Sequence, residues 1–235
     1  SRSGHIVIPR KLRPARAAIA DLELDLLLYP DIGMDSFMSY MAMSRLATAQ
    51  CTTWGHPVTT GIGNMDAFLS IDALESDREN PPYSETLLCQ SIPNLYYRRP
   101  VPEEGVTKAS LGLPEDKRLY GFPQTLFKLH PDFDEVLIDI LRRDPEGALL
   151  MSNATTPYWR RKVVDRLEGK FPGFSERIHW LPNIPREQYV GMLALMDVML
   201  DPFPFGGGNT TLEALSVGTP VVTCPPRFAR GRLAY

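Results

Sequence analysis

Short runs of apolar residues alternate along the chain with longer stretches in which apolar residues recur at helical spacing. This alternation is typical of parallel strands joined by helices, because a strand buried on both faces reads as an apolar run. In the second half of the chain the pattern predicts strands at residues 118–122, 148–151, 178–181, 198–201 and 220–223. Helices are predicted around and between them at residues 132–143, 157–167, 186–196 and 209–217. Five strands with intervening helices predict a doubly wound sheet.

The first half of the chain carries a shorter version of the same pattern. Strands are predicted at residues 23–29, 49–54 and 67–71. A Met-rich segment at residues 36–46 has helical spacing, and we interpret it as core packing rather than as a cofactor site. Residues 98–105 hold two prolines and four charges, which predicts a stiff, solvated connector. We therefore expect a first lobe at 1–97, a linker at 98–105 and a second lobe at 106–235.

The composition argues against several classes of function. The formal net charge is −3 and the basic residues are dispersed, so we expect no nucleic-acid partner. No apolar run approaches the roughly 20 residues needed to cross a bilayer, and the first residues lack the apolar core of a secretory signal. Cys51, Cys89 and Cys224 are far apart without CxxC spacing, so neither zinc nor a disulfide framework is expected. We predict a cytoplasmic protein without a membrane partner.

The most informative segment is 201–220, where a predicted strand runs into three consecutive glycines and then a helix. That helix begins with Asn209, Thr210 and Thr211. Backbone N–H groups and hydroxyls at the positive end of a helix predict a phosphate site, and Asn or Thr can cap the helix when the site is empty. Glu213 follows about one turn later and can accept both hydroxyls of a ribose. The alternative is a capped helix with an exposed glutamate. We favour a nucleotide site because cradle and carboxylate occur together.

A second candidate site follows the first predicted strand of the second lobe, at residues 121–131. In doubly wound sheets, ligands bind at the carboxyl ends of the strands. Lys128 could pair there with a diphosphate, and Gln124 could hydrogen-bond a base or a sugar. A lysine before a helix is by itself more often a solvated charge. Its place on the same sheet edge as the glycine-rich turn favours a role in binding.

Several other patterns are interpreted as structural. Residues 61–66 lack the third glycine of a dinucleotide fingerprint, and no GxxxxGK[ST] loop occurs. Asp132 and Asp134 resemble a metal-binding acidic pair. They lie in the first turn of a predicted helix, where acidic residues complement the helix dipole, so we predict no metal. His56 and His130 each precede a proline and are expected to shape loops rather than to act as a general base.

Four ordered motifs resemble the catalytic region of the O-linked N-acetylglucosamine (O-GlcNAc) transferase family, which includes SPINDLY-like and bacterial relatives. They are the segments 49–70, 83–87, 124–131 and 209–220, and the resemblance runs from about Leu24 to the C-terminus. It implies an α/β fold of the GT-B type, with two Rossmann-like lobes built on parallel sheets. The first lobe is expected to be truncated at its start, and the last helices of the second lobe are expected to be absent.

The resemblance also implies roles for individual residues. Lys128 matches the family's phosphate-contacting lysine, which stabilises the leaving diphosphate, and Gln124 matches the nearby amide. Asn209 and Thr210 match a pair of threonines at a helix start, with Thr211 adjacent. The remaining matches are Glu213 for a ribose-binding aspartate, Gly55 for a glycine of the sugar pocket, Arg186 for a basic residue near the base, and Tyr189 for a histidine there. The last of these is a departure from the family.

The implied activity is the inverting transfer of a sugar from a UDP-sugar to Ser or Thr hydroxyls of a protein. N-acetylglucosamine is the sugar expected first. Neither a metal nor another cofactor is expected. The family's proposed base residues would lie before this chain begins, so the general base is not in this chain and the fragment itself is expected to be inactive. The alternatives are an O-fucosyl- or glucosyl-transferring relative, a nucleotide-sugar epimerase, and a non-catalytic nucleotide-sugar-binding module.

Overall fold

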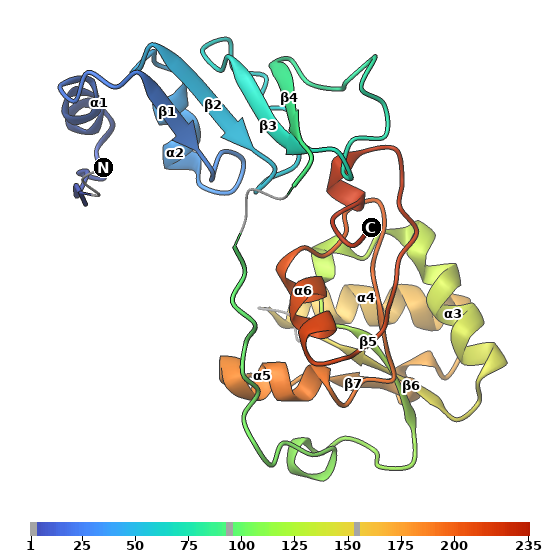
Figure 1. Cartoon of the computed structure of the whole chain (residues 1–235). Coiled ribbons are helices and arrows are strands. Elements are labelled where there is room, and N and C mark those ends of the chain that lie inside the picture. Colours follow the sequence, from blue (N-terminus) through green and yellow to red (C-terminus); the bar gives the residue numbers. More distant parts are fainter. Residues whose placement is uncertain (1–3, 93–95, 153–155) are drawn as a thin grey trace. The chain divides into compact units, whose positions relative to one another are not determined.

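The structure, a computed structural model, describes residues 4–92, 96–152 and 156–235. The chain divides into two compact units (Figure 1). Unit 1 comprises residues 1–96 together with 227–230, and unit 2 comprises residues 97–226 together with 231–235. The chain therefore returns to unit 1 for four residues near its end.

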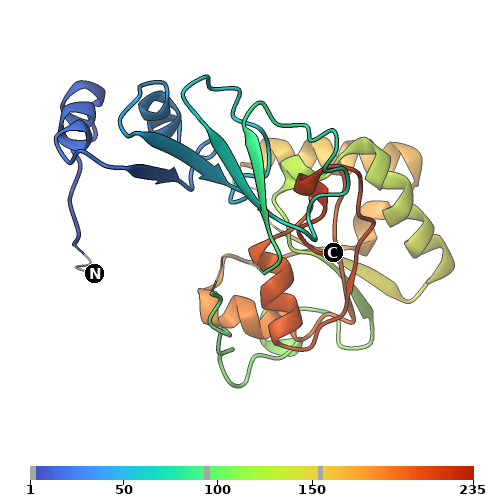
Figure 2. The ribbon, with the colours of Figure 1, turned by 45° about the horizontal axis from the view of Figure 1, so that its top comes forward.

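Unit 1 is built on a parallel sheet of four strands. The strands are β1 (Leu26–Tyr29), β2 (Ala49–Thr53), β3 (Ala67–Ile71) and β4 (Thr86–Gln90). They lie side by side in chain order and all pairs are parallel (Figure 2). Helix α1 (Leu12–Ala20) precedes β1, and helix α2 (Ser36–Ala42) connects β1 to β2.

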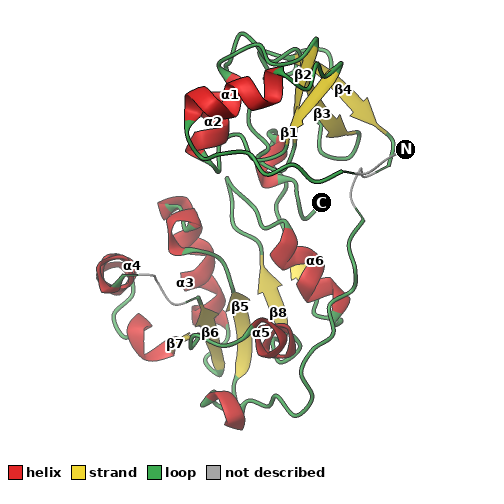
Figure 3. Cartoon of the chain, turned by 90° about the vertical axis from the view of Figure 1, so that its left-hand side faces the viewer, coloured by secondary structure: helices red, strands yellow, loops and turns green. Residues whose placement is uncertain are grey.

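The core of unit 1 lies on one face of its sheet. Ala15 of α1 and Met41 of α2 are buried there with Tyr29 of β1, and both helices lie on the same side of the strands (Figure 3). The Met-rich segment thus contributes to the core, as predicted. Successive strand residues point to opposite faces. Accordingly Leu26 and Leu28 of the same strand are 57% and 44% exposed on the other face.

Unit 2 is built on a parallel sheet of five strands in the order β7-β6-β5-β8-β9. Its strands are β5 (Arg118–Phe122), β6 (Gly147–Met151), β7 (Ile178–Trp180), β8 (Val198–Leu200) and β9 (Val221–Val222). Its α-helices are α3 (Asp134–Arg143), α4 (Pro157–Lys170), α5 (Arg186–Leu193) and α6 (Asn209–Ser216). This is the doubly wound arrangement that the sequence predicts.

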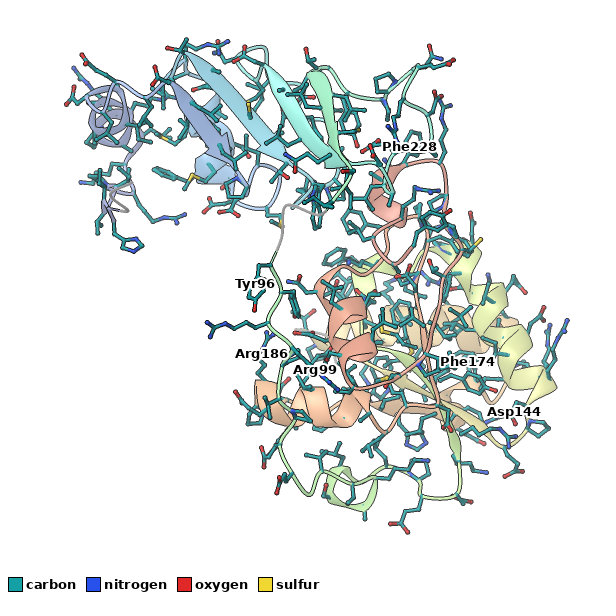
Figure 4. All side chains as sticks on the ribbon, viewed as in Figure 1. Tyr96, Arg99, Asp144, Phe174, Arg186 and Phe228 are labelled. Carbon is teal, nitrogen blue, oxygen red and sulfur yellow. The ribbon has the colours of Figure 1, made fainter. Side chains whose placement is uncertain are left out.

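The sheet of unit 2 separates two cores. Leu149 of β6 packs with α3, α4 and Phe174 on one face, and its neighbour Leu150 packs with α5 and α6 on the other. Figure 3 shows the strands between α3 and α6, and Figure 4 labels Phe174. All five residues of β6 are buried. Because both faces are covered, the strand reads as an unbroken apolar run and was predictable from sequence.

Two elements of unit 1 were not predicted. Helix α1 contains Pro14, which is tolerated because it lies in the first turn, where backbone N–H groups have no intrahelical partner. Strand β4 is an edge strand in which exposed and half-buried residues alternate, so it shows no apolar run. Both elements carry weak sequence signals for a physical reason, namely that little of their surface is buried.

The predicted connector at 98–105 is not simply solvated. The Arg99 guanidinium donates to the Ser216 carbonyl at 2.8 Å, and the Glu103 amide donates to the Glu187 carbonyl at 3.1 Å. The segment is thereby fixed to α5 and α6 within unit 2. The boundary between the units falls between Tyr96 and Tyr97.

Asp134 lies in the first turn of α3, as predicted, but the interpretation that it only complements the helix dipole was incomplete. Its side chain is fully buried and forms ion pairs with Arg166 at 2.8 Å and Lys170 at 3.1 Å, both from α4. Asp132, by contrast, is exposed beside His130. Asp134 therefore joins α3 to α4 beside the core, a role that its position in sequence did not indicate.

Within residues 4–92, 96–152 and 156–235, no helix is long and apolar enough to span a bilayer. No three His, Cys, Asp or Glu side chains in these ranges gather as a metal site would require.

Replacing Asp134 by Ala should lower the free energy of unfolding of unit 2 by about 2–3 kcal/mol, because Arg166 and Lys170 would lose their shared buried partner. The fluorescence of Trp159 and Trp180, both in unit 2, reports the transition in urea. The exposed Asp132→Ala serves as the control and should change stability by no more than about 0.5 kcal/mol. Equal effects of the two substitutions would contradict the structural role of Asp134.

Candidate nucleotide-binding site

The candidate site lies at the point in the sheet of unit 2 where the strand order reverses. From β5 the chain proceeds to β6 on one side, whereas β8 pairs with β5 on the other. The loops after β5 and β8 therefore leave the same sheet edge at adjacent positions. Crevices at such points are where doubly wound sheets bind ligands. The two sequence segments singled out for chemistry, 121–131 and 201–220, contain these two loops.

Lys128 lies in a single 3-10 turn after β5 and points toward the glycine-rich turn. Its ammonium donates to the Gln124 side-chain oxygen at 3.2 Å and to the Gly206 carbonyl at 2.9 Å. It also lies 4.7 Å from the centre of the Phe205 ring. Burial lowers the pKa of Lys128 below its ordinary value, an effect that the nearby Asp201 carboxylate partly offsets. Lys128 is therefore a partly desolvated cation held by neutral oxygens.

Asp201 is the first residue after β8 and is almost fully buried. Its carboxylate accepts from the Gly207 amide at 2.7 Å and from the Thr223 hydroxyl at 2.8 Å. Burial raises the pKa of Asp201. The sequence analysis assigned it no role, although a carboxylate directly after a buried strand was a usable signal.

Helix α6 begins at Asn209, and its N-cap is Gly208. The prediction that Asn or Thr caps the helix was therefore wrong, because Asn209 and Thr210 are already helical and no side chain caps the helix start. Thr211 instead turns inward and donates to the Gly207 carbonyl at 3.0 Å. The first amide groups of α6 thus carry no side-chain cap, which is the condition for binding an anion.

Close packing explains why the turn uses glycine. The Gln124 amide donates to the Thr210 hydroxyl at 2.5 Å, directly across from Gly207. A Cβ at Gly207 would collide with that amide and would lie 2.5 Å from the Thr210 hydroxyl. The contact between Gln124 and Thr210 joins the two loops, as expected from their shared sheet edge.

Glu213 lies one turn into α6 and is not exposed, in contrast to the alternative interpretation. Its side chain is 6% exposed and pairs with Arg186 at 2.7 Å. The Tyr97 hydroxyl donates to the same carboxylate oxygen at 3.2 Å. Burial and the Glu213 charge raise the pKa of Tyr97 and of the half-buried Tyr189. Figure 4 labels Arg186 at the start of α5.

A cavity of about 630 Å³ opens beside this cluster. Among the described residues it is lined by Ser152, Leu181, Pro182, Asn183, Ile184, Arg186, Tyr189, Thr210 and Glu213. Four of these were predicted as donor-binding residues. Ser152 and residues 181–184 were missed, although they directly follow β6 and β7 at the same sheet edge. Gln124 and Lys128 do not line the cavity but connect to it through Thr210.

Gly55 lies in unit 1, where the backbone comes close to another strand. A Cβ at this position would lie 2.8 Å from the Pro30 carbonyl oxygen, so a larger residue would displace the loop. Its assignment to the sugar pocket stays a prediction. His130 accepts from the Asp132 amide at 3.3 Å, which fits the interpretation that it shapes a loop.

The segment after Gly55 is fixed by a buried carboxylate. Glu85, from the 83–87 motif, accepts from the Thr59 hydroxyl and the Thr60 amide, each at 2.8 Å. Two of the motifs that carried the family resemblance are therefore joined in space within unit 1. Their residue types serve this contact as well as any contact with a ligand.

Comparison with known proteins agrees with this geometry. No protein-family model matches the chain. A UDP-glucose:protein N-beta-glucosyltransferase of Actinobacillus pleuropneumoniae serotype 5b is 32% identical over 196 residues, which are 80% of this chain and 30% of that protein. A SPINDLY protein of Hordeum vulgare, named as a probable UDP-N-acetylglucosamine–peptide N-acetylglucosaminyltransferase, is 29% identical over 196 residues, 78% of this chain and 20% of that protein.

Solved structures give the same result. A mutant of the Thermobaculum terrenum O-GlcNAc transferase superposes with a TM-score of 0.75 at 25% identity, over 93% of this chain and 41% of that one. The chain is related to the O-GlcNAc transferase family. A sucrose-phosphate synthase of Thermosynechococcus elongatus has a TM-score of 0.63 at 15% identity, covers 89% of this chain and 58% of that one, and shares the fold alone. The predicted α/β, GT-B type fold of this O-GlcNAc transferase-like chain is confirmed. It spans about a third or less of the length of the curated relatives named above.

Gly207→Ala should lower the free energy of unfolding by about 1–3 kcal/mol, because the new Cβ would push apart Gln124 and Thr210. Urea denaturation measures the change. Gly169→Ala is the matched control, since Gly169 lies within α4 with nothing within 4 Å of its Cβ position. The control should raise stability by about 0.5–1 kcal/mol, because alanine favours the helix. Stabilisation by both substitutions would show that the turn is not closely packed.

Proposed function

We propose that this chain supplies the nucleotide-sugar-binding part of a protein glycosyltransferase, and that unit 2 binds a UDP-sugar in its 630 Å³ cavity. The observation that carries the proposal is the position of this cavity. It lies at the carboxyl ends of parallel strands, between the uncapped start of α6 and a buried carboxylate. Both relatives described above are named for UDP-sugar donors and protein acceptors, which supports the choice of donor and acceptor.

The diphosphate is proposed to bind between α6 and Lys128. The amides of Asn209 and Thr210 present the positive end of the helix, where a phosphate oxygen can accept hydrogen bonds. A lysine ammonium has three donors, and within the described ranges two of them are engaged, by Gln124 and Gly206. The third can approach the diphosphate. Since Lys128 is already partly desolvated, it keeps its attraction for an anion largely unscreened.

The nucleoside is proposed to occupy the cavity itself. Glu213 is placed to accept a ribose hydroxyl, and Arg186 and Tyr189 lie at the same wall. The loop at 181–184 offers backbone groups and the Asn183 amide to a base. The family has a histidine near the base where this chain has Tyr189. Which base the cavity binds is therefore a question for experiment.

The proposed reaction is an inverting displacement. A protein hydroxyl attacks the anomeric carbon, the bond between that carbon and the diphosphate oxygen breaks, and the electron pair leaves with the diphosphate. Lys128 and the start of α6 stabilise the negative charge that grows there, a contribution that requires no metal. The hydroxyl proton passes to a general base that is not assigned to this chain.

The transferred sugar is proposed to be N-acetylglucosamine, with glucose as the second candidate. Similarity to the Actinobacillus enzyme favours the second, because that enzyme is named for UDP-glucose and for an N-linkage to protein. The two candidates differ in donor and in acceptor atom, so they are separable by experiment.

Calorimetric titration of the chain with UDP, GDP, UDP-glucose and UDP-N-acetylglucosamine tests the proposal. UDP is expected to bind with a dissociation constant on the order of micromolar, and GDP more weakly. A second assay mixes the chain with labelled donors and acceptor proteins. Label on protein supports the transferase, binding without transfer supports a non-catalytic nucleotide-sugar-binding module, and absence of binding by a folded sample contradicts the site.

The affinity for UDP should fall as pH rises, and the fall should begin below the ordinary lysine pKa of 10.5. The reason is that burial lowers the pKa of Lys128, so the ammonium loses its charge at a lower pH than an exposed lysine does. Lys128→Met should weaken binding about tenfold near neutral pH and flatten this profile, since a hydrogen bond to a charged group is worth about 1.5–3 kcal/mol. If UDP affinity depended on pH in the same way in both proteins, Lys128 would not be part of the binding site.

A further inference from the structure

Glu213 is held from two directions by groups outside its own helix. Arg186, at the start of α5, pairs with its Oε1 at 2.7 Å, and Tyr97, at the beginning of unit 2, donates to the same oxygen at 3.2 Å. The Arg186 pKa is raised by its hydrogen bond with Tyr97 and by the Glu213 charge, so the three groups form one cluster. Nothing in the proposed function assigns a role to Tyr97.

The other carboxylate oxygen of Glu213 is differently placed. Within residues 4–92, 96–152 and 156–235, Oε2 has no hydrogen-bond partner, while the side chain is 6% exposed and lines the cavity. Since Glu213 lines the cavity, an occupant that donates a hydroxyl can be accepted by Oε2. The donors on Oε1 therefore leave Oε2 for a ligand.

Fixing the Glu213 side chain for ligand binding costs conformational entropy, and the two donors on Oε1 reduce that cost. Its long side chain loses up to about 1.5–2 kcal/mol of rotamer freedom when fixed. Arg186 is 64% exposed, whereas Tyr97 is half-buried and directly precedes a connector fixed to α5 and α6. The tyrosine hydroxyl is thus the donor on the less exposed residue.

We propose that Tyr97 is a positioning residue for ribose recognition: its hydroxyl fixes Glu213 so that Oε2 accepts a ribose hydroxyl of the bound nucleotide. The inference rests on the proposed function, because it requires a nucleotide in the cavity. It adds that preference for ribose over deoxyribose depends on a residue that need not touch the ligand.

The test compares UDP with 2′-deoxy-UDP by calorimetry in four proteins and one control. These are the unchanged chain, Tyr97→Phe, Glu213→Gln and the double variant. Tyr96→Phe is the matched control, because it removes the same hydroxyl from the neighbouring tyrosine, which is 86% exposed (Figure 4). The unchanged chain and the control should prefer UDP about tenfold, as expected for one hydrogen bond to a charged group.

In Tyr97→Phe the preference should fall to about threefold or less, with the affinity for 2′-deoxy-UDP changed less than about twofold. In the Glu213→Gln background the same substitution should change the preference by less than about 1.5-fold, since coupled residues are not additive. A Tyr97→Phe protein that keeps the full preference, or that loses affinity for both nucleotides equally, would overturn the inference.

The outcomes also separate this inference from the proposed function. If UDP binds and Lys128→Met weakens it but the preference for ribose ignores Tyr97, only the role of Tyr97 is lost. If the folded chain binds neither nucleotide, the proposed function fails and the inference fails with it. Repeating the comparison with GDP and 2′-deoxy-GDP makes the result independent of the base, because UDP and GDP carry the same ribose.

Discussion

The hydrogen bond between the Asp201 carboxylate and the Gly207 amide holds the glycine-rich turn in place. It fixes the turn directly after β8, and the start of α6, the Gly206 carbonyl and the contact between Gln124 and Thr210 all follow from that position. Asp201 tolerates burial because it accepts from Gly207 and Thr223 and lies near the charge of Lys128. Without the Asp201 carboxylate, α6 would keep its helix dipole, but the start of the helix would no longer be held in a defined position.

The parts of this structure that could be predicted from sequence include those in which burial is complete. β6 is buried along its whole length and reads as an apolar run, and the glycines before α6 mark a turn whose packing admits no side chain at Gly207. Edge strand β4 and helix α1 bury less and left little pattern. The cap of α6 was misjudged because its residue types suit both a cap and a first helical turn, and only the backbone decides between them.

Contacts between distant residues set the remaining limits. Tyr97 approaches Glu213 across 116 positions of sequence, and no local spacing predicts that meeting. Asp134 looked like an ordinary helix-start acid until α4 brought Arg166 and Lys170 to it. In unit 1, Glu85 joins two of the motifs that carry the family resemblance, because it accepts hydrogen bonds from Thr59 and Thr60.

The four residues 227–230 belong to unit 1, although they follow residues 97–226 of unit 2 in the chain. Arg227 pairs there with Asp77 at 2.8 Å, and its carbonyl accepts from Ser76. During synthesis, domains usually fold in order from the N-terminus. Unit 1 cannot complete its contacts in that order, because residues 227–230 are synthesised only after residues 97–226 of unit 2. Maturation of the first unit is therefore timed by translation of the second, and a chain arrested before residue 227 would expose an unfinished surface to chaperones.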